Sequence, residues 1–102
     1  MSEPTPVCVV TGSSAGIGRE TARGMAERGY SVVVIGRDRA RTEAAATYVS
    51  EHAKSGAATA MLCDFSSLSE VRRLADEIQR RCARVDVLIN NAGLWHPQRT
   101  LS

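Results

Sequence analysis

The sequence predicts an α/β fold in which a parallel sheet is flanked by helices. Four short apolar runs, at 7–10, 31–35, 57–63 and 85–89, alternate with three longer segments of helical periodicity. The run 31–35 is rich in β-branched residues and apolar on both sides, which is typical of a strand covered on its two faces. Strands that alternate with helices along the chain favour a parallel sheet with right-handed crossovers.

The first helix is expected over 16–28, directly after the first apolar run. Its predicted apolar face consists of Ile17, Thr21, Ala22 and Met25. Gly29 follows, and a glycine suits the left-handed position just past a helix end. Asp38 is predicted to cap a second helix that continues to the neighbourhood of Gly56.

The third helix is predicted from a capping box, in which Ser67 caps the helix and Glu70 reaches back to it. Apolar residues then recur at helical spacing: Leu68, Val71, Ala75, Ile78 and Cys82. The opposite face is expected in water, and it consists of Arg72, Arg73, Glu77 and Arg81.

Length and charge exclude several classes of protein. The 102 residues allow one domain at most, and a net charge of +2 is too small to indicate a nucleic-acid or membrane-surface partner. No apolar run approaches the roughly 18 residues of a membrane span. Three widely spaced cysteines form no Cys-x-x-Cys pair, so we expect free thiols, no metal site and a cytoplasmic location.

The turn after the first strand carries the main functional signal. It reads Thr-Gly-Ser-Ser-Ala-Gly-Ile-Gly and opens the first helix. Gly12 permits a tight turn, Gly16 lets the backbone approach a pyrophosphate, and Gly18 allows close packing of helix on strand. Ser13 and Ser14 can add hydroxyl donors. The turn therefore predicts a dinucleotide phosphate site; the alternative is a turn without a ligand.

The spacing T-G-x-x-x-G-x-G resembles the glycine motif of the short-chain dehydrogenase/reductase family. The segment 86–93, Asp-Val-Leu-Ile-Asn-Asn-Ala-Gly, is similar to that family's D-h-L-h-N-N-A-G element. The resemblance implies a Rossmann-type sheet with strand order 3-2-1-4 and a cofactor contact from Ile17. It also implies that Asn90 holds the central strands and that the backbone through Ala92 and Gly93 lies along the cofactor.

The end of the second strand bears on which dinucleotide is bound. By the family's spacing, Gly36 occupies the discriminating position, so no carboxylate stands there, and Arg37 follows it. A guanidinium suits the 2′-phosphate, so the resemblance favours NADP over NAD. Asp38 offers an alternative, because its carboxylate could reach the ribose instead of capping the second helix.

At the end of the third strand, Asp64 and Phe65 resemble the family's adenine contact. The Asp64 carboxylate would accept the exocyclic amine, and the Phe65 backbone would donate to the ring. The alternative is that Asp64 simply starts the loop before Ser67.

The sequence predicts no catalytic residue. The family's Tyr-x-x-x-Lys pair is absent, because Tyr30 and Tyr48 are followed four positions later by Val34 and His52. We therefore expect 1–93 to be the dinucleotide-binding half of an oxidoreductase that acts on a carbonyl or alcohol, truncated after the fourth strand, with an irregular tail at 94–102. A non-catalytic nucleotide-binding module and a degenerate product are the alternatives. The open edge of the fourth strand predicts self-association.

Overall fold

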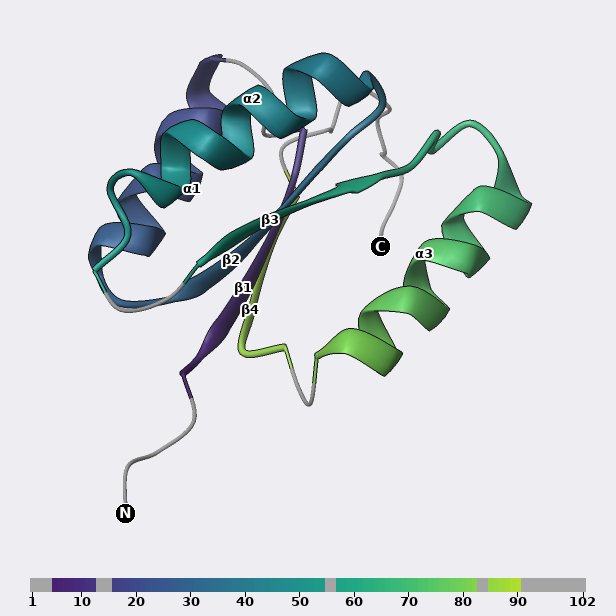
Figure 1. Ribbon diagram of the computed structural model, residues 1–102. Coiled ribbons are helices and arrows are strands. Elements are labelled where there is room, and N and C mark those ends of the chain that lie inside the picture. Colours follow the sequence, from purple (N-terminus) through teal and green to yellow (C-terminus); the bar gives the residue numbers. More distant parts are fainter. Residues whose placement is uncertain (1–4, 13–15, 55–56, 83–84, 91–102) are drawn as a thin grey trace.

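The computed structural model describes residues 5–12, 16–54, 57–82 and 85–90 (Figure 1). Along the chain, strands and helices alternate as the sequence predicts. The elements are β1 (Val7–Thr11), α1 (Gly16–Glu27), β2 (Ser31–Gly36), α2 (Arg39–Ser50), β3 (Ala58–Leu62), α3 (Leu68–Arg81) and β4 (Val87–Asn90).

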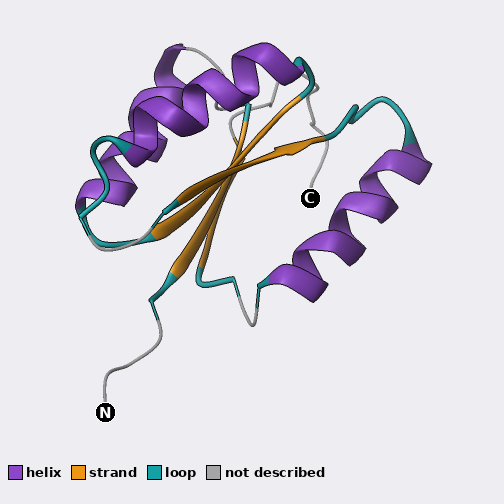
Figure 2. Cartoon of the chain, in the orientation of Figure 1, coloured by secondary structure: helices purple, strands orange, loops and turns teal. Residues whose placement is uncertain are grey.

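All strands of the described sheet are parallel, in the order β3-β2-β1-β4. Val9 of β1 lies beside Val33 of β2 and Leu88 of β4, which sets the register across the centre. Helices α1 and α2 cover one face of the sheet and α3 covers the other (Figure 2). This is a Rossmann-type arrangement, and it confirms the predicted fold and strand order.

The core is divided between the two faces of the sheet, because side chains alternate along each strand. Toward α1 and α2 the buried residues are Cys8, Val10, Ala22, Ala26, Val32, Val34, Ala46 and Val49. Toward α3 they are Val9, Val33, Ile35, Met61, Cys63 and Leu74. Both faces of β1 and β2 are therefore buried, as the apolar runs predict.

The signals at the helix ends are confirmed at two places. Oδ1 of Asp38 accepts a hydrogen bond of 2.9 Å from the backbone N–H of Arg41, so Asp38 caps α2. Gly29 adopts φ +98° just after α1, a conformation that glycine reaches without a steric penalty.

The predicted end of the second helix is wrong, since α2 ends at Ser50 rather than near Gly56. The backbone N–H groups of His52 and Ala53 bond three residues back instead of four, which tightens the last turn. The N–H of Lys54 then bonds to the carbonyl of Ala26 in α1, at 3.1 Å. This contact draws the chain toward α1 and away from the helix axis.

Three side chains predicted on apolar helix faces are exposed instead: Ala75, where the neighbouring Leu74 is the buried residue of α3, and two residues at helix starts. Ile17 is 80% exposed and Leu68 is 66% exposed, and each lies in the first turn of its helix, at the carboxyl ends of the strands. The predicted capping box is confirmed at Ser67 and wrong at Glu70. Ser67 Oγ accepts from the Glu70 N–H at 3.4 Å, whereas the Glu70 carboxylate pairs with Arg73 and not with the backbone of Ser67.

Within the described ranges, no helix is both long enough and apolar enough to cross a lipid bilayer. The longest of them, α3, has 14 residues and is strongly charged.

Candidate functional site

The carboxyl ends of the strands meet at one edge of the sheet and are joined there by backbone hydrogen bonds. The N–H of Gly12, just past β1, donates to the carbonyl of Ile35 in β2 at 3.0 Å. The N–H of Cys63, just past β3, donates to the carbonyl of Gly36 at 3.0 Å. The loops that follow β1, β2 and β3 therefore start side by side, at the edge where open α/β sheets bind ligands.

Strand β4 is fixed to β1 at both of its ends. At the carboxyl end, the Thr11 hydroxyl donates to Oδ1 of Asn90 at 2.9 Å. At the other end, the N–H of Val7 donates to Oδ2 of Asp86 at 2.8 Å, and the Asp86 N–H donates to the Val7 carbonyl at 2.9 Å. Asn90 thus holds the central strands as the family resemblance implies. Asp86 does the same at the opposite end, a role that the sequence did not predict.

The turn between β1 and α1 has the backbone geometry that its glycines predict. Gly12 and Gly16 adopt φ +65° and +62°, in the left-handed region. Among the described residues, a Cβ added at Gly16 would meet nothing within 4 Å, so the backbone there faces open space. Gly18 is buried within α1. The first turn of α1 carries no acidic residue, so its positive end is not neutralised by the helix itself.

Other predicted cofactor residues are distributed around this turn. Ile17 is exposed next to Gly16, at the start of α1. Arg37 is exposed and follows β2 directly. Ser13, Ser14, Ala92 and Gly93 lie outside the described residues. Asp38 caps α2 through its Oδ1 atom, and Arg37 is the side chain at this strand end that makes no hydrogen bond or ion pair in the described part of the chain.

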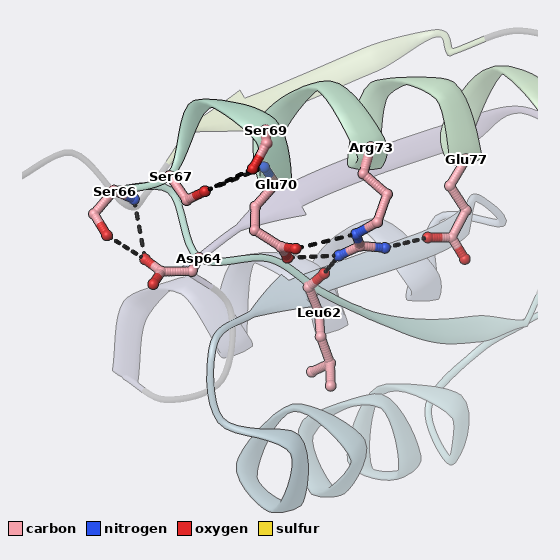
Figure 3. A network of polar contacts seen from close by, with 8 residues as sticks. All are labelled: Leu62, Asp64, Ser66, Ser67, Ser69, Glu70, Arg73 and Glu77. Atoms are coloured by element: carbon pink, nitrogen blue, oxygen red, sulfur yellow. Dashed lines mark hydrogen bonds and ion pairs between the residues drawn. The ribbon is translucent and has the colours of Figure 1, made fainter.

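Asp64 starts a compact turn between β3 and α3 (Figure 3). Its Oδ1 accepts from the hydroxyl of Ser66 at 2.7 Å and from the Ser66 N–H at 3.0 Å. These bonds from Ser66 hold the pKa of the Asp64 carboxyl below its ordinary value, and the positive charge of Arg37 lowers it further. The Asp64 carbonyl accepts from the N–H of Ser67 at 3.1 Å, so Asp64 does begin the loop before Ser67.

The same carboxylate remains open on its other oxygen. Within the described residues, Oδ2 of Asp64 accepts no hydrogen bond, and the adjacent Phe65 is 39% exposed. A carboxylate with one oxygen held and the other free can orient a ligand's amine donor.

Arg73 is exposed, as predicted, but its guanidinium also makes contacts that the sequence did not predict. Its guanidinium donates to the carbonyl of Leu62 at 2.8 Å and pairs with Glu70 at 2.9 Å and Glu77 at 3.3 Å (Figure 3). The spacing of Glu70, Arg73 and Glu77 predicts helix ion pairs. The bond to the strand end could not be read from that spacing, because it depends on how α3 packs beside β3.

Comparison with known proteins agrees with this geometry. The model of the short chain dehydrogenase family matches residues 6–102. Human retinol dehydrogenase 13 is 37% identical over 91 residues, which cover 89% of this chain and 28% of that protein. Carbonyl reductase family member 4 of Xenopus tropicalis is 40% identical over 90 residues, covering 88% of this chain and 36% of that protein. The chain thus spans about a third of the length of these relatives.

Solved structures share both the fold and the sequence similarity. The RhlG/NADP active-site complex of Pseudomonas aeruginosa superposes with a TM-score of 0.79 at 39% identity, over 86% of this chain and 34% of that one. A metagenomic short-chain oxidoreductase in complex with NADP also gives a TM-score of 0.79, at 35% identity, over 87% of this chain and 39% of that one.

Proposed function

Because this chain belongs to the short-chain dehydrogenase family, we propose that its strand ends hold a nicotinamide dinucleotide. The observation that carries the proposal is the β1–α1 turn, where Gly12 and Gly16 are both left-handed and open space lies beside Gly16. A side chain at Gly16 would occupy that space. Its absence lets a pyrophosphate approach the backbone and the positive end of α1.

The charge at the end of β2 favours NADP(H) over NAD(H). No carboxylate stands at Gly36 to bind the ribose hydroxyls and repel a 2′-phosphate, and Arg37 is exposed immediately after it. The Oδ1 atom of Asp38 is held by the cap of α2, which favours Arg37 as the group that meets the 2′-phosphate. Two structurally similar proteins are described as NADP complexes, in agreement with this assignment.

We propose hydride transfer between NADP(H) and a carbonyl or alcohol as the reaction of the whole protein. When bound, NADPH supplies the hydride, while the residues of this chain bind and orient the cofactor. The names of the relatives, a retinol dehydrogenase and a carbonyl reductase, fit an alcohol or carbonyl substrate. Ser13, Ser14, Ala92 and Gly93 belong to the proposed cofactor site by their place in the two motifs.

A second candidate is a nucleotide-binding module without turnover. It shares with the first candidate the dinucleotide site at the strand ends, which is the part of the protein that the described residues form. The two candidates share the cofactor site and differ only in whether bound NADPH is consumed when a panel of aldehydes and ketones is added.

The test is a fluorescence titration of the purified chain with NADPH and with NADH. We expect NADPH to bind about tenfold more tightly, because a guanidinium–phosphate pair is a strong charge-assisted contact. Arg37→Gln should remove this preference, whereas Arg80→Gln, an exposed arginine on α3, should preserve it. Equal or tighter binding of NADH by the unmodified chain would overturn the assignment of NADP.

A further inference from the structure

The peptide group between Leu62 and Cys63 is held from both sides. Its N–H donates to the carbonyl of Gly36 in β2 at 3.0 Å. In a trans peptide the carbonyl points the opposite way, so the Leu62 carbonyl points out of the sheet from β3. Since β3 is the edge strand of the described sheet, no strand is there to bond this carbonyl, and Arg73 donates to it at 2.8 Å.

Arg73 makes this contact with a guanidinium that is already oriented by the helix. Its Nη2 and Nε bond to the two carboxylate oxygens of Glu70, at 2.9 and 3.4 Å, and its Nη1 lies 3.3 Å from Glu77 (Figure 3). A planar fork held at two points has little rotamer freedom left to lose when it binds the carbonyl. One side chain of α3 therefore fixes the end of β3.

The loop between these anchors is the one that presents Asp64 and Phe65. It leaves the fixed peptide at Cys63 and enters α3 at Ser67, whose hydroxyl accepts the Glu70 N–H. Glu70 in turn pairs with Arg73. Both ends of the short loop are thus connected to one guanidinium.

We propose that Arg73 is a positioning residue for adenine recognition, acting through the peptide of Leu62 and the loop that carries Asp64. The inference rests on the proposed binding of a dinucleotide. The same peptide group also fixes the end of β2, because its N–H bonds to the carbonyl of Gly36, the residue directly before Arg37. Arg73 thereby links α3 to the two strand ends that face the adenosine half of the cofactor.

The experiment compares NADPH with its purine analogue, in which a hydrogen atom replaces the adenine amine and the ring nitrogens stay acceptors. An Asp64 carboxylate held in place accepts from the amine and meets no donor at that position in the analogue, so the unmodified chain should prefer NADPH. Arg73→Gln should weaken NADPH binding about fivefold, as expected for a charge-assisted bond at a half-exposed site, and should bring the preference close to one. Asp64→Asn should abolish the same preference, and the double variant should lose nothing more.

Arg72→Gln is the matched control, because Arg72 is the preceding arginine of α3 and its side chain makes no hydrogen bond or ion pair in the described part of the chain. Arg73→Lys serves if the glutamine variant does not fold. A lysine can reach one acceptor but lacks the fork, so an intermediate preference is expected. A merely structural role would weaken both dinucleotides equally and leave their ratio unchanged.

The outcomes distinguish failure of the positioning role of Arg73 from failure of the proposed dinucleotide binding. A preference that persists in Arg73→Gln overturns the positioning role, as does an unmodified chain that binds both dinucleotides equally well. If the unmodified chain binds neither dinucleotide, the proposed function itself fails and the positioning role falls with it.

Discussion

The hydroxyl of Thr11 donates to Oδ1 of Asn90 across 2.9 Å, although 79 positions separate the two residues in the chain. The same two residues are register partners in β1 and β4. This bond and the Asp86–Val7 pair at the other end add to the backbone ladder that joins the four residues of β4 to β1. The bond also fixes the strand end from which the Asn-Asn-Ala-Gly segment departs.

Thr11→Val keeps the shape of the side chain and removes the hydroxyl donor. We expect the free energy of unfolding to fall by about 1 kcal/mol, the usual net value of an intramolecular hydrogen bond. Urea unfolding followed by circular dichroism measures this. Thr47→Val is the control, since Thr47 is exposed on α2 and its hydroxyl bonds only to the helix backbone. Equal losses in the two variants would show that the Thr11–Asn90 bond contributes nothing particular to stability.

Two glycines of α1 should respond to alanine with opposite signs. Both have open space at the Cβ position, so packing does not distinguish them. Gly16 has φ +62°, and Gly16→Ala should cost roughly 1 kcal/mol of stability because an L-residue is strained there. Gly24 lies inside the helix, and Gly24→Ala should add about 0.5–1 kcal/mol. Thermal unfolding of the two variants checks the signs; a stabilising Gly16→Ala would contradict the left-handed turn.

The hydrogen bonds from Ser66 should make part of the stability depend on Asp64 ionisation. They lower the pKa of Asp64 in the folded chain, so its contribution is fully present above the unfolded pKa of about 3.9 and is lost as the pH falls through the folded value. Ser66→Ala removes the hydroxyl donor, and the pKa should rise toward its ordinary value. An NMR titration of the Asp64 carboxyl measures the shift. Ser69→Ala should leave the pKa of Asp64 unchanged. An unaltered pKa in Ser66→Ala would show that the Ser66 hydroxyl does not lower it.

The elements that sequence patterns predicted well are those fixed by local chemistry. The strands 31–35 and 7–10 are apolar on both faces and are buried on both faces in the structure. Asp38 and Gly29 mark helix ends through bonds and dihedral angles that involve only neighbouring residues. The strand order came from resemblance to a family, since alternation alone does not say which strands are neighbours.

What the sequence could not supply depends on contacts between distant elements. The early end of α2 involves a bond from Lys54 to Ala26, and the role of Arg73 involves the carbonyl of Leu62. Helical periodicity also misplaced Ile17, because it assigns faces as if every turn of a helix were covered. Ile17 lies in the first turn of α1, next to the left-handed Gly16, where its side chain is exposed although that of Gly18 is buried.

Self-association through β4 remains a prediction, and the residues exposed at this edge of the described sheet can be named. Within the described sheet β4 is an edge strand, Leu88 on it is 67% exposed, and Val85 before it is 41% exposed. Because an open edge with apolar side chains pairs readily, we expect the sedimentation coefficient of the chain to rise with concentration. Leu88→Lys should suppress the rise, while Leu68→Lys, at an exposed site on α3, should not. A concentration-independent monomer would contradict the prediction.

The three thiols should differ sharply in reactivity, because only thiolates are alkylated. Cys8 is fully buried, and burial raises its pKa to about 11; burial also raises the pKa of Cys63. Cys82 is partly exposed at the end of α3. Iodoacetamide at mildly alkaline pH should therefore modify Cys82 alone in the folded chain and all three cysteines in denaturant, as intact-mass spectrometry would show. Cys82→Ser should abolish native labelling. Rapid native labelling of Cys8 would contradict the prediction, because it would mean that α1 separates from β1 far more readily than the packing of this core predicts.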